Sequence, residues 1–337
     1  MFRSGLSITT ITKDIYQSMN PSFLTTTIVC SEPAWAGERI DSFLHARIPE
    51  FSRNYFQELI DAGFVLVNDL PLAKNNYRIK LNDRVSATLR TKLCNTAPAH
   101  VDFEVIDEQP DFLVINKPAG LLVHHTATNP EEITLVNGLL HRFPDMQKIE
   151  GNERPGIIHR IDKNTSGILL VARNLQAHNA FTALFKERKI EKTYLAIVTG
   201  NPPVSGRIDL AVGRHPTERH KMSTIGIESR SALSFYKVQE QFSTASLLEV
   251  RIVTGRTHQV RVHCAAIGHG LLGDDVYGVK HPLIARQALH ARRVTFTYQG
   301  KAFSYEAPIP SDMQRLLQGL TGTQLGMGGI DMMQEIR

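Results

Sequence analysis

The sequence has few cysteines and no long apolar run, and both shortages exclude whole classes of protein. Its 337 residues include three cysteines, Cys30, Cys94 and Cys264, which are far apart and form no CxxC pair. This spacing indicates neither a zinc knuckle nor a disulfide framework, so we expect reduced thiols in a cytoplasmic protein. No apolar stretch approaches the roughly 20 residues that cross a bilayer, so no membrane partner is expected.

Nucleotide-binding signatures are also missing. The chain contains neither a GxGxxG fingerprint nor a Walker loop, and it shows no internal repeat. These absences argue against a Rossmann-type dinucleotide fold. The first 23 residues are mixed and polar, without the continuous apolar core of a secretion signal. We expect residues 1–23 to be a flexible extension, with either Met1 or Met19 as the true start.

The overall composition is that of an ordinary globular protein. Hydrophobic residues make up 42% and charged residues 21%, and the length predicts roughly two domains. The formal net charge is +5. Such a mild basic excess is compatible with a polyanionic partner but does not demand one.

Residues 24–90 are predicted to form a small α/β unit. A first helix, 38–47, and a second helix, opened by Ser52 and closed by Gly63, each have an apolar face. A strand at 64–67 and a turn at Asn68 and Asp69 follow. Arg53 lies at the start of the second helix, where it forms either part of a solvated surface or a contact with phosphate.

Residues 91–99 resemble a linker, and residues 100–325 are predicted to form a second, mixed α+β domain before a tail at 326–337. Strands are expected at 101–106, 112–116, 168–172, 193–198 and 247–253. Asn129 and Pro130, followed by two glutamates, predict the start of one helix, and 175–189 predicts another.

The segment from Arg154 to Gly167 is dense in groups that carry chemistry. Asp162 stands among Arg154, His159, Arg160 and Lys163, and nearby cations favour the ionised form of an acid. Gly156 and Gly167 predict unusual backbone geometry at the two ends of the loop. The alternative is a solvated loop with ion pairs on its surface, which is the commoner situation for a loop aspartate.

A second dense segment runs from Thr254 to Gly268. We expect Thr257 to cap a helix that Gly268 closes, with Val260, Cys264 and Ile267 on its apolar face. Arg261 points away from that face, and an arginine so placed often pairs with a buried carboxylate. His258, His263 and His269 are five and six residues apart, which does not suit a zinc site.

Two further features have two interpretations each. Tyr194 lies on a predicted strand and is either a core residue or a platform for stacking on a base. The basic segment that includes Arg214 and Arg219 stands between strand-like segments. It is either a charged hairpin or a finger that contacts phosphates.

The motifs HRIDKNTSG, KTYLAIV and TGRTHQVRVH resemble those of the RluA family of pseudouridine synthases. The segments NKPAGLLVH and GHGLLGD resemble two further family motifs, and the likeness covers nearly the whole chain. Residues 24–90 resemble the S4 RNA-binding module, which favours phosphate contact by Arg53. The departures are Ile161, His125 and Gly270, which lie outside the residues needed for chemistry.

The resemblance implies an α+β fold with a mixed, mostly antiparallel catalytic sheet behind an S4-like domain. It implies an isomerase that flips a uridine from structured RNA and converts it to pseudouridine, as a monomer and without metal or cofactor. Asp162 would act as nucleophile or proton abstractor, Arg261 would hold it, and Tyr194 would stack on the base or assist proton transfer. The expected RNA contacts are Arg53, Arg160, Arg214, Arg219, Arg256 and His258.

The S4-like module, the loop RHPTER at 214–219 and the segments RQALH at 286–290 and APIP at 307–310 look most like the RluD subgroup. This likeness implies large-subunit ribosomal RNA and within it the loop of helix 69. Three alternatives stay open from the sequence. The chain is a synthase for other ribosomal or transfer RNA uridines, a non-catalytic RNA-binding ribosome-assembly factor, or a carboxylate-dependent glycosidase. The last requires two acids facing one bond, and only Asp162 has a suitable setting.

Overall fold

The computed structural model describes residues 23–49, 51, 53–72, 74, 76–90, 96–125, 131–149, 154–218 and 221–325. These residues divide into two compact units. The first unit contains the described residues up to 95 and those within 147–153. The second unit contains the described residues of 96–146 and 154–337. The predicted domain boundaries stay a prediction. Residues 1–22, the first half of the expected linker and the tail 326–337 lie outside the described ranges.

The first unit is a four-stranded antiparallel sheet covered by two helices. Its strand order is β1-β4-β2-β3, and the elements are β1 (Phe23–Val29), β2 (Val65–Val67), β3 (Leu70–Pro71), β4 (Arg84–Arg90), a short 3-10 helix (Pro33–Trp35), α1 (Ile40–Arg47) and α2 (Arg53–Asp61). The predicted apolar faces of both helices are confirmed, because Ile40, Phe43, Phe56 and Ile60 are buried in one core. Ser52, the predicted cap of α2, lies outside the described residues.

The second unit is built on a nine-stranded sheet. Its main path is β5-β6-β7-β15-β8-β14-β13-β9, and β16 pairs with β15. All of its pairs are antiparallel among the described strands except β7 with β15. The strands are β5 (Glu104–Glu108), β6 (Phe112–Lys117), β7 (Ser166–Ala172), β8 (Glu191–Thr199), β9 (Ser205–Asp209), β13 (Leu233–Gln241), β14 (Ala245–Ile252), β15 (Leu289–Tyr298) and β16 (Lys301–Glu306).

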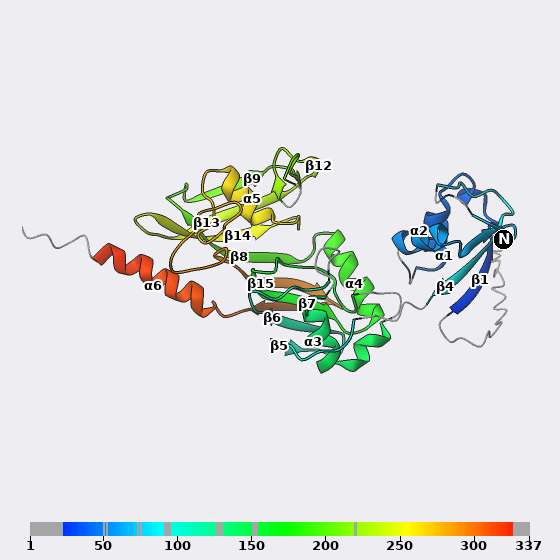
Figure 1. Ribbon diagram of the computed structural model, residues 1–337, viewed down its shortest axis with the longest axis horizontal. Helices are drawn as coiled ribbons and strands as arrows, with labels where there is room; N and C mark the ends of the chain where they lie inside the picture. The colour runs from blue at the N-terminus through cyan, green and yellow to red at the C-terminus, as the bar shows by residue number, and fades with distance from the viewer. Residues whose placement is uncertain are drawn as a thin grey trace, which may run out of the picture. The chain divides into compact units, whose positions relative to one another are not determined.

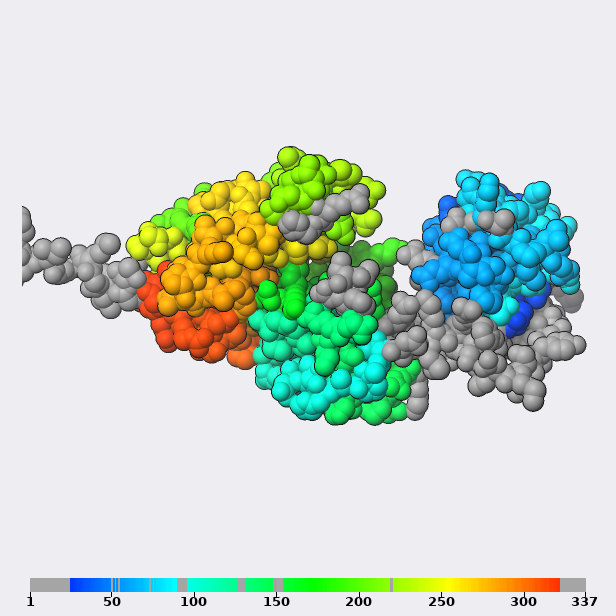
Figure 2. Space-filling view, viewed as in Figure 1, coloured from blue at the N-terminus to red at the C-terminus, as the bar shows by residue number. Residues whose placement is uncertain are grey.

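Among the described residues, a small second sheet, four α-helices and the start of a 3-10 segment complete this unit. The order β11-β10-β12 joins β10 (Val212–Arg214), β11 (Met222–Ser223) and β12 (Ile227–Arg230). The helices are α3 (Leu135–Arg142), a 3-10 turn (Pro144–Lys148), α4 (Leu175–Lys186), α5 (Gln259–Ala266) and α6 (Ser311–Leu325). Helices α3 and α4 lie beside β5–β7, whereas α5 lies beside β13 and β14 (Figure 1). The yellow-green residues around β10–β12 form a lobe on the body of the unit (Figure 2).

An aromatic cluster fixes α4 on the sheet. Phe181 of α4 lies 5.4 Å from the ring centroid of Phe112, 5.4 Å from Phe296 and 4.8 Å from Tyr298. These rings and the fully buried strand β7 form the main core. Aromatic pairs of this geometry stabilise beyond their buried area. The predicted helix 175–189 ends at Lys186, because the chain turns left-handed at Arg188, with φ 59°.

Two predicted helix starts are wrong, those of α3 and α5. Helix α3 begins at Leu135, not after Asn129, because the side chains of Thr134 and Asn137 form a capping box there. Glu132 instead pairs with Lys163 at 2.6 Å. Asn129 itself lies outside the described residues.

In α5 the cap position belongs to His258 rather than Thr257. None of the helices in the described ranges is long and apolar enough to span a membrane.

Candidate active site

Asp162 lies in the loop that leads into β7. The loop is bracketed by Gly156, with φ +75°, and Gly167, with φ +110°, which confirms the predicted backbone geometry. At Gly167 a β-carbon would collide with the backbone of Ala291. Glycine is therefore required where β7 meets β15, and this close approach anchors the end of the loop. Thr165 donates its backbone N–H to the Asp162 carbonyl at 3.0 Å, which tightens the turn.

Arg261 of α5 joins two carboxylates. Its Nη1 lies 3.4 Å from Oδ2 of Asp162, whereas its Nε and Nη2 donate to Asp274 at 2.7 and 2.8 Å. Asp274 is fully buried and also accepts the N–H groups of Val276 and Tyr277. The bidentate pair fixes the guanidinium plane, so the remaining nitrogen is held toward Asp162.

Asp274 holds Arg261 in place, and the sequence did not predict this contact. It appeared within a motif, but nothing local reveals that it orients Arg261. Burial alone would raise the pKa of the Asp274 carboxyl, but the hydrogen bonds and charge of Arg261 outweigh it and hold the pKa below its usual range. The available signal was the prediction that Arg261 pairs with a buried carboxylate. The structure gives that place to Asp274, because Asp162 keeps 20% of its side chain exposed.

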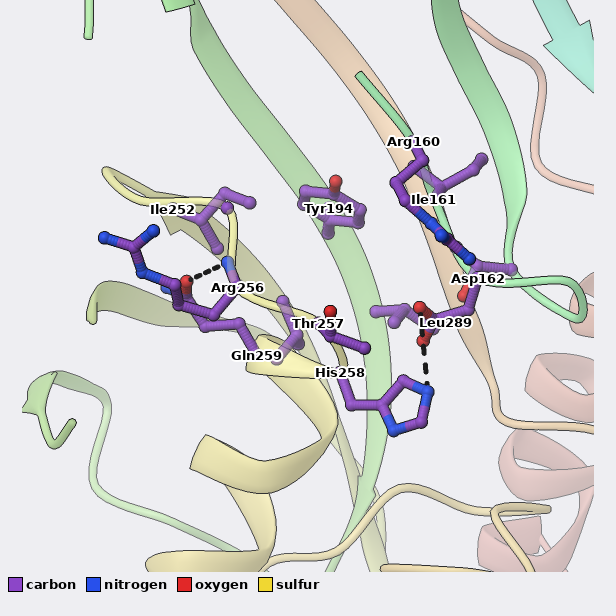
Figure 3. A pocket seen from close by; sticks show the side chains of 13 residues that line it. Arg160, Ile161, Asp162, Tyr194, Ile252, Arg256, Thr257, His258, Gln259 and Leu289 are labelled. Carbon is purple, nitrogen blue, oxygen red and sulfur yellow. Dashed lines mark hydrogen bonds and ion pairs between the residues drawn. The ribbon is translucent and has the colours of Figure 1, made fainter. Parts of the chain in front are cut away.

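Tyr194 comes from the centre of β8 and lines the same pocket as Asp162 (Figure 3). Its side chain is buried, and burial together with the Asp162 carboxylate raises the pKa of the phenol above its usual range. At neutral pH Tyr194 is therefore a neutral phenol, which suits packing against a base better than accepting a proton.

His258 faces Asp162 from the start of α5. Its backbone is left-handed, with φ 57°, a conformation that costs about 1–3 kcal/mol for such a residue and is typical of functional sites. Its Nδ1 lies 2.8 Å from the Tyr277 hydroxyl, and its Nε2 lies 4.0 Å from Oδ1 of Asp162. Arg160, Arg256 and His258 all line the Asp162 pocket, so the structure brings together these three predicted RNA contacts.

Of the loop cations, Arg160 lines the Asp162 pocket, whereas His159 and Lys163 do not. His159 is partly buried and accepts the Leu170 N–H at 2.8 Å, and burial lowers its pKa to about 3, so it is neutral. Lys163 pairs with Glu132. Arg160 lies 3.3 Å from His124 through Nη1. The arginine that contacts Asp162 comes instead from α5, far away in the sequence.

A second hollow adjoins the first and shares Arg160, Tyr194 and Arg256 with it. Its other basic residues are Lys186, Arg188 and Lys192, and no carboxylate lines it among the described residues. Burial lowers the pKa of Lys192 to about 8. A groove with this charge is suited to a polyanion rather than to a neutral ligand.

The remaining predicted contacts lie away from the pocket or outside the described residues. Arg214 ends β10 and is exposed, while Arg219 falls in the undescribed pair 219–220. Arg53 belongs to the first unit. There it donates to Asp41 at 3.1 Å, beside further hydrogen bonds to Asp41 from Arg39 and Gln57.

The other histidines that raised the question of a metal have protein partners. His263 contacts the hydroxyl of Ser234 and the carbonyl of Leu210, and His269 contacts the carbonyl of Thr199.

Lys117 is a second residue whose role the sequence did not reveal. It is fully buried at the end of β6, and its Nζ donates to the carbonyls of Pro118, Leu121 and Lys163 at 2.7–2.9 Å. Lys163 directly follows Asp162, so this lysine ties the Asp162 loop to the loop after β6. Burial and the charge of Arg286 lower the pKa of Lys117 to about 7.

Comparison with known proteins identifies both units. A family described as "RNA pseudouridylate synthase" matches residues 111–266, a span that contains Asp162, Tyr194 and Arg261. The S4 domain family matches residues 38–85.

Relatives match over most of the chain. "Ribosomal large subunit pseudouridine synthase D" of Neisseria meningitidis serogroup B is 38% identical over 85% of this chain and 79% of its own length. "Uncharacterized RNA pseudouridine synthase YlyB" of Bacillus subtilis is 38% identical over 84% of this chain and 94% of its own. Among solved structures, "Human RNA Pseudouridylate Synthase Domain Containing 1" is 27% identical with a TM-score of 0.52, covering 65% of this chain and 95% of that one.

Proposed function

We propose that this chain acts on ribosomal RNA of the large subunit. The chain belongs to the family of RNA pseudouridine synthases. Membership makes the chain an isomerase that converts uridine to pseudouridine in RNA. Relatives from Neisseria meningitidis and Zymomonas mobilis whose names specify the ribosomal large subunit support this substrate. Within it we propose the loop of helix 69, by likeness to the RluD subgroup, and the cytoplasm as the place of action.

The observation that carries the proposed mechanism is that Asp162 and Tyr194 line one pocket while Arg261 contacts the Asp162 carboxylate. Three separate segments deliver them, and the adjoining groove is basic. A uridine flipped from its stack would place its ribose against Asp162 and its base against Tyr194. Arg261 would orient the carboxylate through Nη1.

Asp162 acts in this proposal as nucleophile or as proton abstractor. The bond between C1′ and N1 breaks, the uracil turns, and a bond between C1′ and C5 forms while C5 loses its proton and N1 gains one. Atoms and electrons balance without an oxidant or reductant, so no cofactor is required by the chemistry. The phenol of Tyr194 serves as a packing surface.

In this proposal the RNA is bound by residues of both units. Arg160, Arg256 and His258 contact the target nucleotide and its neighbours, Arg214 and Arg219 contact the phosphate backbone, and Arg53 acts from the S4 domain. The proposed active form is a monomer.

The role of the S4 domain is tested by deletion. Deletion of residues up to about 90 should weaken binding to folded RNA more than it harms the fold of the second unit. Unchanged affinity would count against the role of the S4 domain.

The test is conversion of uridine in defined RNA. Purified protein, without added metal, should form pseudouridine in transcribed large-subunit RNA, and Asp162→Asn should abolish it. Asp209→Asn is the matched control, since Asp209 is an exposed residue of the edge strand β9. Full turnover by Asp162→Asn would overturn the role of Asp162.

The position of the modified uridine is tested separately. Pseudouridines are mapped in ribosomal and transfer RNA from cells with and without the gene. A change confined to transfer RNA would replace the ribosomal target with a transfer RNA target. The name of the relative YlyB specifies neither kind of RNA. Rescue of a growth phenotype by Asp162→Asn would favour the non-catalytic assembly role.

A further inference from the structure

His258 stands between a hydroxyl on one side and the catalytic carboxylate on the other. Its Nδ1 is 2.8 Å from the Tyr277 oxygen, and its Nε2 is 4.0 Å from Oδ1 of Asp162. In Figure 3 the ring points one nitrogen at the carboxylate. Arg261 approaches the other carboxylate oxygen, Oδ2. The two side chains therefore bracket Asp162 from different directions.

The hydrogen bonds of Tyr277 favour one of the two neutral tautomers of His258. The backbone N–H of Met222 donates to the Tyr277 oxygen at 2.6 Å, and a backbone N–H has no other role than donor. The phenol then needs an acceptor for its own proton. Among the described residues, Nδ1 of His258 is the acceptor that Tyr277 contacts. A neutral imidazole that accepts at Nδ1 carries its proton on Nε2.

The surroundings keep both groups in the protonation states that this arrangement needs. Burial lowers the pKa of His258, and Arg261 and Arg160 act in the same direction, while Asp162 and Asp274 oppose them without reversing the shift. The ring is therefore neutral at pH 7. Burial raises the pKa of Tyr277, so its hydroxyl keeps the proton that it donates.

We propose that His258 is a positioning residue for Asp162: Tyr277 holds the ring as the tautomer protonated on Nε2, and this N–H is directed at Oδ1 while Arg261 serves Oδ2. The inference rests on the proposed catalytic role of Asp162. The separation exceeds a direct hydrogen bond, so the contact closes when the side chains settle around a bound uridine. A neutral donor orients the carboxylate without adding a second full positive charge beside it.

The tautomer is measured directly by ¹⁵N NMR on the full chain with labelled histidine, and the His258 signals are assigned from their loss in His258→Gln. The wild type should show Nδ1 bare and Nε2 protonated at neutral pH. Tyr277→Phe should shift His258 toward a mixture of tautomers. A wild-type ring protonated on Nδ1 overturns the inference. An unchanged tautomer of His258 in Tyr277→Phe overturns it as well.

Turnover of two amide variants separates a donor role from a purely structural one. The amide nitrogen of glutamine reaches the place of Nε2, whereas that of asparagine reaches the place of Nδ1. Of the two variants, His258→Gln should therefore retain the higher kcat. His258→Asn should lose about 10- to 100-fold, the loss expected for a hydrogen bond to a charged group.

Backbone preference predicts the opposite order, because asparagine adopts the left-handed conformation of His258 more readily than glutamine does. Urea midpoints of both variants record that effect separately. Equal turnover, or asparagine above glutamine, overturns the inference while leaving Asp162 in place if Asp162→Asn is inactive. An active Asp162→Asn would instead remove the proposed mechanism itself.

Discussion

Replacing Arg261 with methionine separates the structural role of the arginine from its proposed role in catalysis. The substitution keeps a long side chain but removes both nitrogens that bind Asp274 and the one that approaches Asp162. Asp274 is then a carboxylate with no exposed surface that has lost its ion-pair partner. Breaking one side of a buried ion pair costs about 3–5 kcal/mol, most of it from the charge left behind.

The backbone N–H groups of Val276 and Tyr277 still reach Asp274 and moderate that cost. We therefore expect Arg261→Met to lose about 3 kcal/mol in the free energy of unfolding. Urea denaturation followed by circular dichroism at neutral pH measures this loss. The depressed pKa of Asp274 stabilises the native protein above the usual carboxyl range, and that contribution is lost as the pH falls through the folded-state pKa. The acid-induced loss of stability should accordingly be shallower in the variant.

The double variant Arg261→Met with Asp274→Asn is the control. The amide keeps an oxygen for the two backbone donors and removes the charge, so most of the lost stability should return. Pseudouridine formation should not return, because Asp162 still lacks its arginine. A loss below about 1 kcal/mol in Arg261→Met would refute the reasoning about the buried pair. Recovered turnover in the double variant would refute the role of Arg261 at Asp162.

Three further outcomes are expected. Lys192→Gln should reduce the slope of log affinity for RNA against log salt by about 0.7–0.9, measured by filter binding. Because burial sets the pKa of Lys192 to about 8, wild-type affinity should fall as pH rises through 8, and the variant should lack that fall. Phe181→Ala should cost about 3–5 kcal/mol in urea denaturation, since the ring centres the aromatic cluster. A loss near zero would contradict that packing. For Lys117→Met, the pKa near 7 means that the native state releases a proton which the unfolded chain holds up to about 10.5. Wild-type stability should then rise from pH 7 to 10 relative to the variant, and parallel curves would show the lysine to be unperturbed.

Much of the fold was predictable wherever a single element carries its own pattern. The apolar spacing of α1 and α2 and the continuous apolar run of β7 depend on local sequence, and the structure has them where the pattern predicts. Strand β1 was missed, although the alternation in FLTTTIV carries a strand signal. The prediction had placed the unit's boundary at that point instead.

The errors occur where a distant partner decides the outcome. Glu132 is expected in a first helical turn, yet it lies before α3 and forms an ion pair with Lys163. His258 takes the cap position of α5 with a backbone conformation that the Tyr277 contact helps to hold. Neither contact has any trace in local sequence. In the same way Asp274 and Lys117 serve the site through tertiary hydrogen bonds that residue spacing does not encode.

The strand order has a consequence for the newly made chain. β15, residues 289–298, inserts between β7, which follows the Asp162 loop, and β8, which carries Tyr194. These two parts of the active site therefore have no fixed separation until a strand near the end of the sequence has been synthesised and has left the ribosome. We therefore expect a nascent chain to form no pseudouridine until β15 has paired with both β7 and β8.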